Sequence, residues 1–150
     1  MSADAQVMEP IMNSPHLVLA RHISLELVSG EGPKQRVPAN LRYDARDPYA
    51  VTLLIGDPSC PIEWTFAREL LDGGLRQPCG DGDVHVWPIP EDGGREVLLI
   101  ELVSPAGEAL LQASPRDVQT FLALTHVLVA PGEESDHLDI DGLVGALLAV

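Results

Sequence analysis

The chain has 150 residues, of which 23 are acidic and 9 are basic, so its formal net charge is −14. This length fits a single domain with a sizeable core, and because aromatic residues make up only 4% of the chain, that core must be aliphatic. The acidic residues are scattered along the chain, which argues against nucleic acid and anionic lipid as partners, because polyanion binding needs clustered Lys and Arg.

The N-terminal residues 1–14 show little hydrophobic periodicity, so we expect a flexible arm followed by a single domain over residues 15–150. The first ten residues, MSADAQVMEP, carry acids where a secretory signal would carry basic residues, and this indicates a cytoplasmic protein. No stretch approaches the roughly 20 apolar residues of a membrane-spanning helix, so direct membrane insertion is not expected.

The region up to residue 112 has the pattern of antiparallel strands joined by short turns. Residues 22–27 alternate between polar and apolar, and residues 49–55 form a continuous aliphatic run typical of a strand buried on both faces. Ile62, Trp64 and Phe66 alternate before good helix formers, which predicts a short strand followed by one helical turn. Further strands are expected at residues 35–43, 83–88, 95–103 and 108–112, and turns at residues 80–82, 91–94 and 104–107.

After residue 113 the period changes from that of a strand to that of a helix. Ser114 offers an N-cap, Pro115 needs no N–H at the first helical position, and Asp117 places a carboxylate in the first turn. A last apolar segment over residues 143–150 predicts a further helix that needs a surface to cover it. The fold predicted from these patterns is α+β, with antiparallel strands followed by C-terminal helices.

Motifs for catalysis or metal binding are missing from the pattern. The five histidines are widely spaced, and Ser59 and Cys60 lack the frame of a nucleophile with its base. The glycine pairs are too short and too acidic to cradle a phosphate. We therefore predict that the chain is not an enzyme and carries no cofactor or metal.

The connection over residues 43–49, YDARDPY, is a polar turn between two predicted strands. Asp44 and Asp47 suit side chain to backbone hydrogen bonds, and Pro48 fixes the exit of the turn. This interpretation does not explain why tyrosines and arginines bracket the turn. Such a composition is also favoured at protein interfaces, so a partner surface is a second interpretation.

Five blocks of sequence carry a resemblance to a known family. They are residues 43–51, 64–75, 80–84, 104–110 and 121–134, including WTFARELL, GDGDV and SPAGEAL. In these blocks the chain resembles the SsgA-like proteins of sporulating actinomycetes, which are sporulation-specific cell division proteins, and it is most similar to their SsgB branch.

The resemblance implies a non-enzymatic regulator of sporulation-specific cell division, which marks septum sites and recruits the tubulin-like division protein FtsZ together with an SsgA-type protein. It implies a cytoplasmic protein at the division septum. It also implies a whirly-like domain of two antiparallel β-sheets followed by helices, assembled as a homotrimer. The alternative is a whirly-like single-stranded nucleic-acid-binding protein, although the basic surface for that function is absent from the sequence.

The family has no catalytic residues to carry over, so the candidate site residues are those of interfaces. The candidates for contact with a protein partner are Tyr43, Asp44, Arg46, Asp47, Tyr49 and Arg68. The candidates for self-assembly or the intrachain core are Val118, Phe121, Leu122, Leu143, Leu147 and Leu148.

Overall fold

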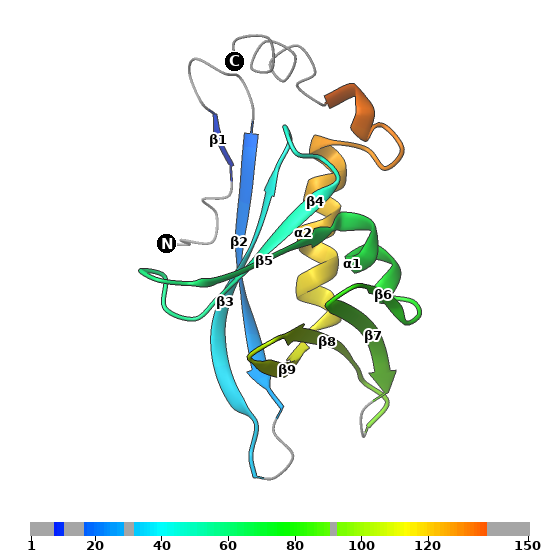
Figure 1. Cartoon of the computed structure of the whole chain (residues 1–150). Helices are drawn as coiled ribbons and strands as arrows, with labels where there is room; N and C mark the ends of the chain where they lie inside the picture. Colours follow the sequence, from blue (N-terminus) through cyan, green and yellow to red (C-terminus); the bar gives the residue numbers. More distant parts are fainter. Residues whose placement is uncertain (1–7, 11–16, 29–31, 91–92, 138–150) are drawn as a thin grey trace.

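The computed structural model describes residues 8–10, 17–28, 32–90 and 93–137, and in this part of the chain a bent antiparallel β-sheet wraps around two α-helices (Figure 1). The strands are β1 (Met8–Pro10), β2 (Leu17–Leu27), β3 (Gln35–Asp44), β4 (Ala50–Ile55), β5 (Ile62–Ala67), β6 (Cys79–Asp81), β7 (Val84–Pro90), β8 (Glu96–Ser104) and β9 (Gly107–Ala113). The helices are α1 (Arg68–Gly74), α2 (Pro115–Leu128) and the short 3-10 helix η2 (Glu134–His137). The prediction of a mainly antiparallel domain with helices is confirmed.

Hydrogen bonds join the strands into one sheet in the order β5-β4-β3-β2-β9-β8-β7-β6, and β1 pairs with β2. This corrects the prediction of two separate sheets. The reason lies in β2, an eleven-residue strand that pairs with β3 through Val18 to Leu27 along one edge, whereas β1 and β9 share the other edge. The β9 contact is short, from Leu25 to Leu27, so the two halves of the sheet meet at one end of β2.

The predicted arm over residues 1–14 contains β1, whose Met8 lies opposite Leu19 of β2. The other residues of that arm lie outside the described part of the chain. A second difference concerns the predicted turn at residues 80–82. Gly80 and Asp81 belong to strand β6, and the turn follows at Gly82, where φ is +64° and the absence of a side chain avoids strain.

The path from β5 into α1 follows the predicted change of pattern. Phe66 is buried on β5, and α1 begins at Arg68. At the end of α1, a Cβ added to Gly74 would lie 2.3 Å from Cγ1 of Val86 on β7. The helix can therefore lie this close to the sheet because position 74 has no side chain.

Helix α2 begins as the sequence predicts. The Ser114 hydroxyl accepts a hydrogen bond from the N–H of Asp117 at 3.4 Å, and Pro115 is the first helical residue. The inward face of α2 carries Val118, Phe121 and Leu122, whose side chains are at most 2% exposed. These three residues, which the sequence left open between core and self-assembly, belong to the core.

The core is aliphatic, as the composition requires, and it fills the concave face of the bent sheet. Helix α2 packs there against β2 and β8, and Tyr43 and Phe121 are the largest fully buried side chains. The candidates Leu143, Leu147 and Leu148 lie outside the described residues.

Candidate interaction surface

The connection between β3 and β4 is a tight turn that its own side chains and backbone stabilise. A carboxylate oxygen of Asp44 accepts a hydrogen bond from the N–H of Arg46 at 2.8 Å, and the Asp44 carbonyl accepts from the N–H of Asp47 at 2.9 Å. The Asp47 carbonyl accepts from the N–H of Ala50 at 3.2 Å. Asp44 thus plays the part predicted for an Asx turn, and Asp47 contributes its backbone carbonyl.

Tyr43 holds this turn from below. Its ring is 1% exposed, and its hydroxyl donates a hydrogen bond to the carbonyl of Pro48 at 2.9 Å. Burial raises the pKa of Tyr43 to about 12, an effect that the nearby Arg68 guanidinium opposes. The phenol therefore remains a neutral donor over the physiological pH range.

Arg68 links the turn to the end of helix α2. Its side chain is 2% exposed, and its Nη1 donates to the carbonyls of Val129 at 2.8 Å and Thr125 at 3.2 Å. A cation near the last carbonyls of a helix satisfies orphan acceptors and complements the helix dipole. The guanidinium carbon also lies 5.1 Å from the centroid of the Tyr43 ring, within the range of a cation–π contact.

Glu134 completes the environment of Arg68. Its carboxylate lies 2.7 Å from Nη2 of Arg68 and also accepts a hydrogen bond from the N–H of Gly132 at 2.9 Å. The hydrogen bond from Arg68 holds the pKa of Glu134 below its usual range. We call these residues the buried junction: Tyr43, Arg68, Thr125, Val129 and Glu134.

The backbone of Arg68 also bonds to the turn. Its N–H donates to the carbonyl of Tyr49 at 2.7 Å, directly before β4 begins. A single residue thus fixes the exit of the turn through its N–H and the end of α2 through its guanidinium. The turn is therefore held in one conformation by groups that belong to distant parts of the sequence.

The remaining candidates of the connection stand at the surface. Arg46 and Asp47 are exposed, Asp44 is partly exposed, and the Tyr49 side chain is 50% exposed. We call these four residues the turn surface. Arg46 lies 3.7 Å from Asp44, so the turn surface presents charges of both signs beside an aromatic ring.

Two hollows flank the turn surface. One, of about 410 Å³, lies on the outer face of the sheet, where Arg42 and Thr52 join Asp44, Arg46 and Asp47 among its lining residues. The other, of about 300 Å³, lies beside Tyr49 and α1 and is edged by Glu69 and Asp72. Concave surfaces on both sides of a rigid polar turn suit contact with another macromolecule.

Two of the six predicted partner contacts therefore need correction. Tyr43 and Arg68 are buried, and their polar atoms are used inside the chain, so they support the turn surface from beneath and do not present themselves to a partner. The other four candidates lie together at the surface, and their contact with a partner stays a prediction.

The sequence analysis missed the partners of Arg68, namely Thr125, Val129 and Glu134. One signal for its burial was present, because Ile62, Trp64 and Phe66 alternate along β5 and position 68 continues that period of two. No comparable local signal indicates that Glu134, 66 residues further along the chain, supplies the countercharge.

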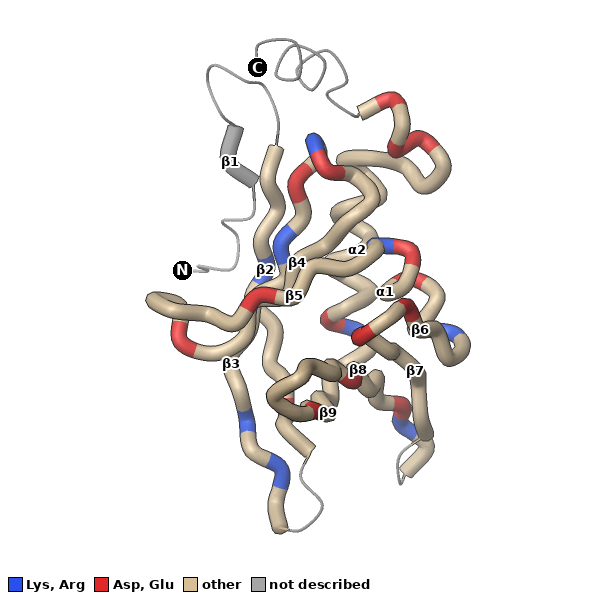
Figure 2. Tube along the Cα trace, viewed as in Figure 1, with Lys and Arg blue, Asp and Glu red and all other residues tan. Residues whose placement is uncertain are grey.

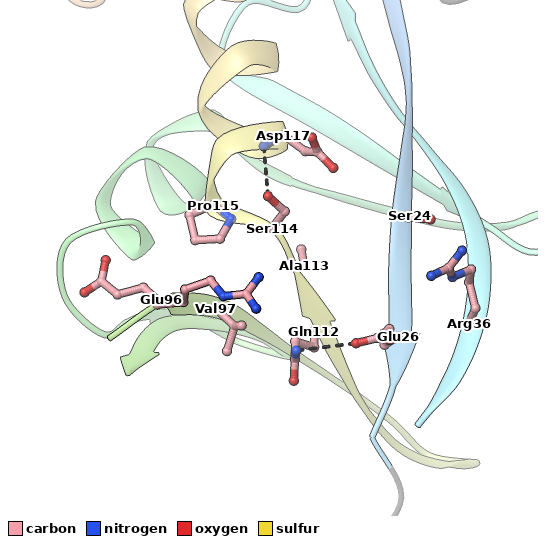
Figure 3. A pocket seen from close by; sticks show the side chains of 11 residues that line it. Ser24, Glu26, Arg36, Glu96, Val97, Gln112, Ala113, Ser114, Pro115 and Asp117 are labelled. Atoms are coloured by element: carbon pink, nitrogen blue, oxygen red, sulfur yellow. Dashed lines mark hydrogen bonds between the residues drawn. The ribbon is translucent and has the colours of Figure 1, made fainter. Parts of the chain in front are cut away.

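A further hollow of about 340 Å³ lies beside the N-terminus of α2 (Figure 3). Glu26 and Arg36 come from β2 and β3, and Gln112 donates a hydrogen bond to Glu26 at 3.4 Å. The Ser114 hydroxyl is used as the helix cap, and no histidine lines this hollow. A Ser–His pair of the kind that activates a serine nucleophile is therefore absent from the lining of this hollow.

Within the described residues, no group of three or more His, Cys, Asp or Glu side chains is placed to hold a metal ion. The closest histidine contact of this kind is between His126 of α2 and Asp72 of α1, at 2.9 Å. It joins the two helices. In the same part of the chain, no helix is long and apolar enough to cross a membrane.

Charge is divided unevenly between the two halves of the chain. Residues 17–65 contain five basic and six acidic residues, whereas residues 66–150 contain four basic and fifteen acidic residues. Figure 2 shows that most of the blue positions lie along β2, β3 and the turn after β3, where red positions accompany them. Among the described residues, Lys and Arg thus alternate with Asp and Glu along the chain, which differs from the clustered basic residues that nucleic-acid binding requires.

The family model described as "Streptomyces sporulation and cell division protein, SsgA" matches residues 37–134, which include the turn surface and the buried junction. The chain belongs to the SsgA family. The resemblance seen in the five sequence blocks is thereby confirmed.

Relatives of the chain are named sporulation-specific cell division proteins. The sporulation-specific cell division protein SsgB of Streptomyces coelicolor is 46% identical over 129 residues, covering 85% of this chain and 93% of the relative. The SsgB of Kineococcus radiotolerans is 44% identical over 128 residues, covering 85% of this chain and 78% of the relative. These names support a role in sporulation-specific cell division.

Solved structures of the SsgA family share the fold. An SsgA-like sporulation-specific cell division protein from Thermobifida fusca aligns with a TM-score of 0.79 and 35% identity, covering 90% of this chain and 98% of that one. An SsgB structure connected with longitudinal cell division during sporulation of Streptomyces coelicolor aligns with a TM-score of 0.76 and 43% identity, covering 82% and 97%. The bent antiparallel sheet with its helices is therefore the fold of the family.

Proposed function

We propose that the chain is a non-enzymatic regulator of sporulation-specific cell division that marks septum sites and recruits FtsZ, with the help of an SsgA-type protein. The observation that carries this proposal is the turn surface, in which Asp44, Arg46, Asp47 and Tyr49 stand exposed on a turn fixed from beneath. A preformed surface binds without first losing conformational entropy, which favours recognition of a partner. Membership of the SsgA family supplies the process in which the partner acts.

The composition of the turn surface suits such a partner. An exposed tyrosine offers a large contact area with few rotatable bonds, and Arg46 and Asp47 can pair with charges of either sign. The net charge of −14 opposes nucleic acid, whereas contact with a protein depends on the charges that face each other at the interface, and the turn surface carries both signs. We extend the proposal to a homotrimer, which would present three copies of the turn surface and so increase avidity.

Two experiments test the proposed function. Co-sedimentation with polymerised FtsZ, alone and with an SsgA-type protein, should carry the chain into the pellet in at least one of the two conditions. A fluorescent fusion in sporulating hyphae should form rings or ladders before septa become visible. A diffuse fusion together with a chain that stays in the supernatant in both conditions would contradict the proposal.

A further inference from the structure

An apolar groove lies at the other end of strands β3, β4 and β5 from the turn surface. It has a volume of about 390 Å³, and Glu108 is the one charged side chain among the described residues that line it. Trp64, in its wall, lies two positions before the buried Phe66 on β5, so both side chains face the same side of the sheet. The groove therefore continues the concave core face beyond helix α2, which contributes no residue to its lining.

Strand β5 forms one rim of this groove and is the last strand at one end of the sheet. Its pairing with β4 is continuous, from Ile55 opposite Ile62 to Ala50 opposite Ala67, so no bulge twists this edge away. Its sequence, IEWTFA, contains no lysine or proline, with which edge strands commonly resist pairing. At the other end of the sheet order, β6 has only three residues and packs against α1. Of these two ends, β5 is therefore the one that can accept another strand.

The side chains of β5 indicate which kind of strand fits beside it. On the groove side, Ile62 is 62% exposed and Trp64 is partly buried. On the opposite side of the sheet, Glu63 and Thr65 are exposed. A strand added beside β5 places its alternate side chains next to these two sets. One set of the added side chains must therefore be apolar, and the other must suit an acidic neighbour.

Two carboxylates give this place a negative charge. Glu108 is exposed in the lining of the groove, and Glu63 is exposed on β5. Nη2 of Arg42 lies 3.9 Å from Glu63 in an exposed pair, which contributes little to stability and leaves Glu63 open to another cation. A basic side chain in the added strand therefore has the complementary charge.

We propose that the groove and the edge of β5 receive an extended segment of another protein, with apolar residues at alternate positions and lysine or arginine between them. Such a segment extends the sheet by one strand through backbone hydrogen bonds, and its apolar side chains fill the groove. The contact lies at the opposite end of β5 from Arg68 and the turn surface. It is therefore independent of the function proposed above.

Charge argues against the C-terminal segment of this chain as the occupant, whether it comes from the same copy or a second one. Residues 138–150 span up to roughly 45 Å when extended, so length does not exclude them. Their sequence, LDIDGLVGALLAV, carries two acidic residues and no basic one. Its alternating part, residues 138–141, would place acids opposite Glu63, and like charges on neighbouring strands are destabilising. The remainder is uncharged and offers no partner to Glu63 or Glu108.

Two synthetic peptides test the proposal, acetyl-KVTVKV-amide and the charge-reversed acetyl-EVTVEV-amide. In a Trp87→Phe background, Trp64 is the single tryptophan, so its fluorescence reports binding at the groove. The lysine peptide should bind with a dissociation constant below about 1 mM, and the glutamate peptide should bind at least about tenfold more weakly. Hydrogen exchange should show new protection of amides in β5 and none in β6.

The double variant Glu63→Lys, Glu108→Lys tests the charge argument, and it should reverse the preference so that the glutamate peptide binds more tightly. The double variant Glu96→Lys, Glu133→Lys is the matched control. It changes the net charge by the same amount at two exposed positions outside the groove. At physiological ionic strength its affinity for the lysine peptide should stay within about threefold of that of the unchanged chain.

Four outcomes would overturn the proposal. The first is an unchanged chain that binds neither peptide or binds both equally, and the second is a control variant that reverses the preference as well. Binding that appears only after Leu143→Asp, Leu147→Asp substitution would assign the groove to the C-terminal segment of the same copy. A molar mass that falls in light scattering as the peptide binds would assign it to a second copy. Circular dichroism of each variant confirms that lost binding is not a lost fold.

Discussion

The buried junction and the turn surface lie on the two sides of one short connection, yet they use arginine in opposite ways. Arg68 is 2% exposed, and its guanidinium donates hydrogen bonds to Val129, Thr125 and Glu134. Arg46, by contrast, is exposed and forms an ion pair with Asp44 at the surface. The first arrangement stabilises the chain, whereas the second lies on the surface that we propose for partner binding. Substitutions should therefore separate stability from partner binding at this connection.

The largest effect on stability should come from Arg68→Met. The substitution removes the Arg68 donor from the Val129 carbonyl and the positive charge from beside the Glu134 carboxylate, and breaking a buried ion pair costs about 3–5 kcal/mol of the free energy of unfolding. Urea denaturation measures this loss. Arg46→Met is the matched control and should change the free energy of unfolding by less than about 0.5 kcal/mol, because its pair with Asp44 is exposed. Equal losses of the free energy of unfolding in Arg68→Met and Arg46→Met would contradict the distinction between the buried junction and the turn surface.

A smaller loss, of roughly 1.5–3 kcal/mol, should follow Glu134→Gln, because the amide oxygen can still accept from Arg68 but no longer supplies the negative charge opposite the guanidinium. The pKa of Glu134 is lowered in the folded state, so its contribution is fully present above the unfolded pKa near 4.5 and is lost as the pH falls through the folded value. The difference between the unchanged chain and Glu134→Gln should therefore shrink below about pH 4.5. A difference that stays constant down to pH 2 would contradict this assignment.

Tyr43→Phe should cost about 1 kcal/mol, since it removes the hydrogen bond to the Pro48 carbonyl and keeps the ring beneath Arg68. The pKa of Tyr43 is raised to about 12, so its contribution is present below pH 10 and is lost as the pH rises from about 10 to 12, where the unfolded chain ionises first. Alkaline denaturation should therefore be less steep in Tyr43→Phe. If the unchanged chain and Tyr43→Phe lost stability equally between pH 10 and 12, a group other than Tyr43 would be responsible for the loss.

Most of the fold could be predicted from local patterns. Helix α2 was predicted nearly at its observed start from the cap at Ser114 and the proline at the first helical position. The transition from β5 to α1 was predicted from the alternation through Phe66. The single sheet was not predicted, because it depends on a three-residue pairing between β2 and β9, which are about 85 residues apart. A contact of that kind leaves no periodicity in either segment.

The residues of the candidate site were predicted from the sequence, but the burial of Arg68 was not. The turn and the Asx hydrogen bond of Asp44 follow from the residues of the connection and are confirmed, whereas contact of Arg46, Asp47 and Tyr49 with a partner stays a prediction. Arg68 was expected at the surface because arginine is seldom fully buried. Its burial depends on Glu134 and the end of α2, and these distant partners cannot be recognised from the residues around position 68.

The smallest effect on stability and the largest on binding should come from the turn surface itself. The triple variant Arg46→Ala, Asp47→Ala, Tyr49→Ala removes three exposed side chains and should change the free energy of unfolding by no more than about 1 kcal/mol. Val127→Ala, which trims another exposed apolar side chain on α2, is its control.

Co-sedimentation of these two variants with polymerised FtsZ, in the presence of an SsgA-type protein, tests the central claim most directly. If this SsgA-family chain acts by presenting the turn surface, the triple variant remains in the supernatant, while Val127→Ala pellets as the unchanged chain does. A folded triple variant that pellets as well as the unchanged chain would contradict the claim.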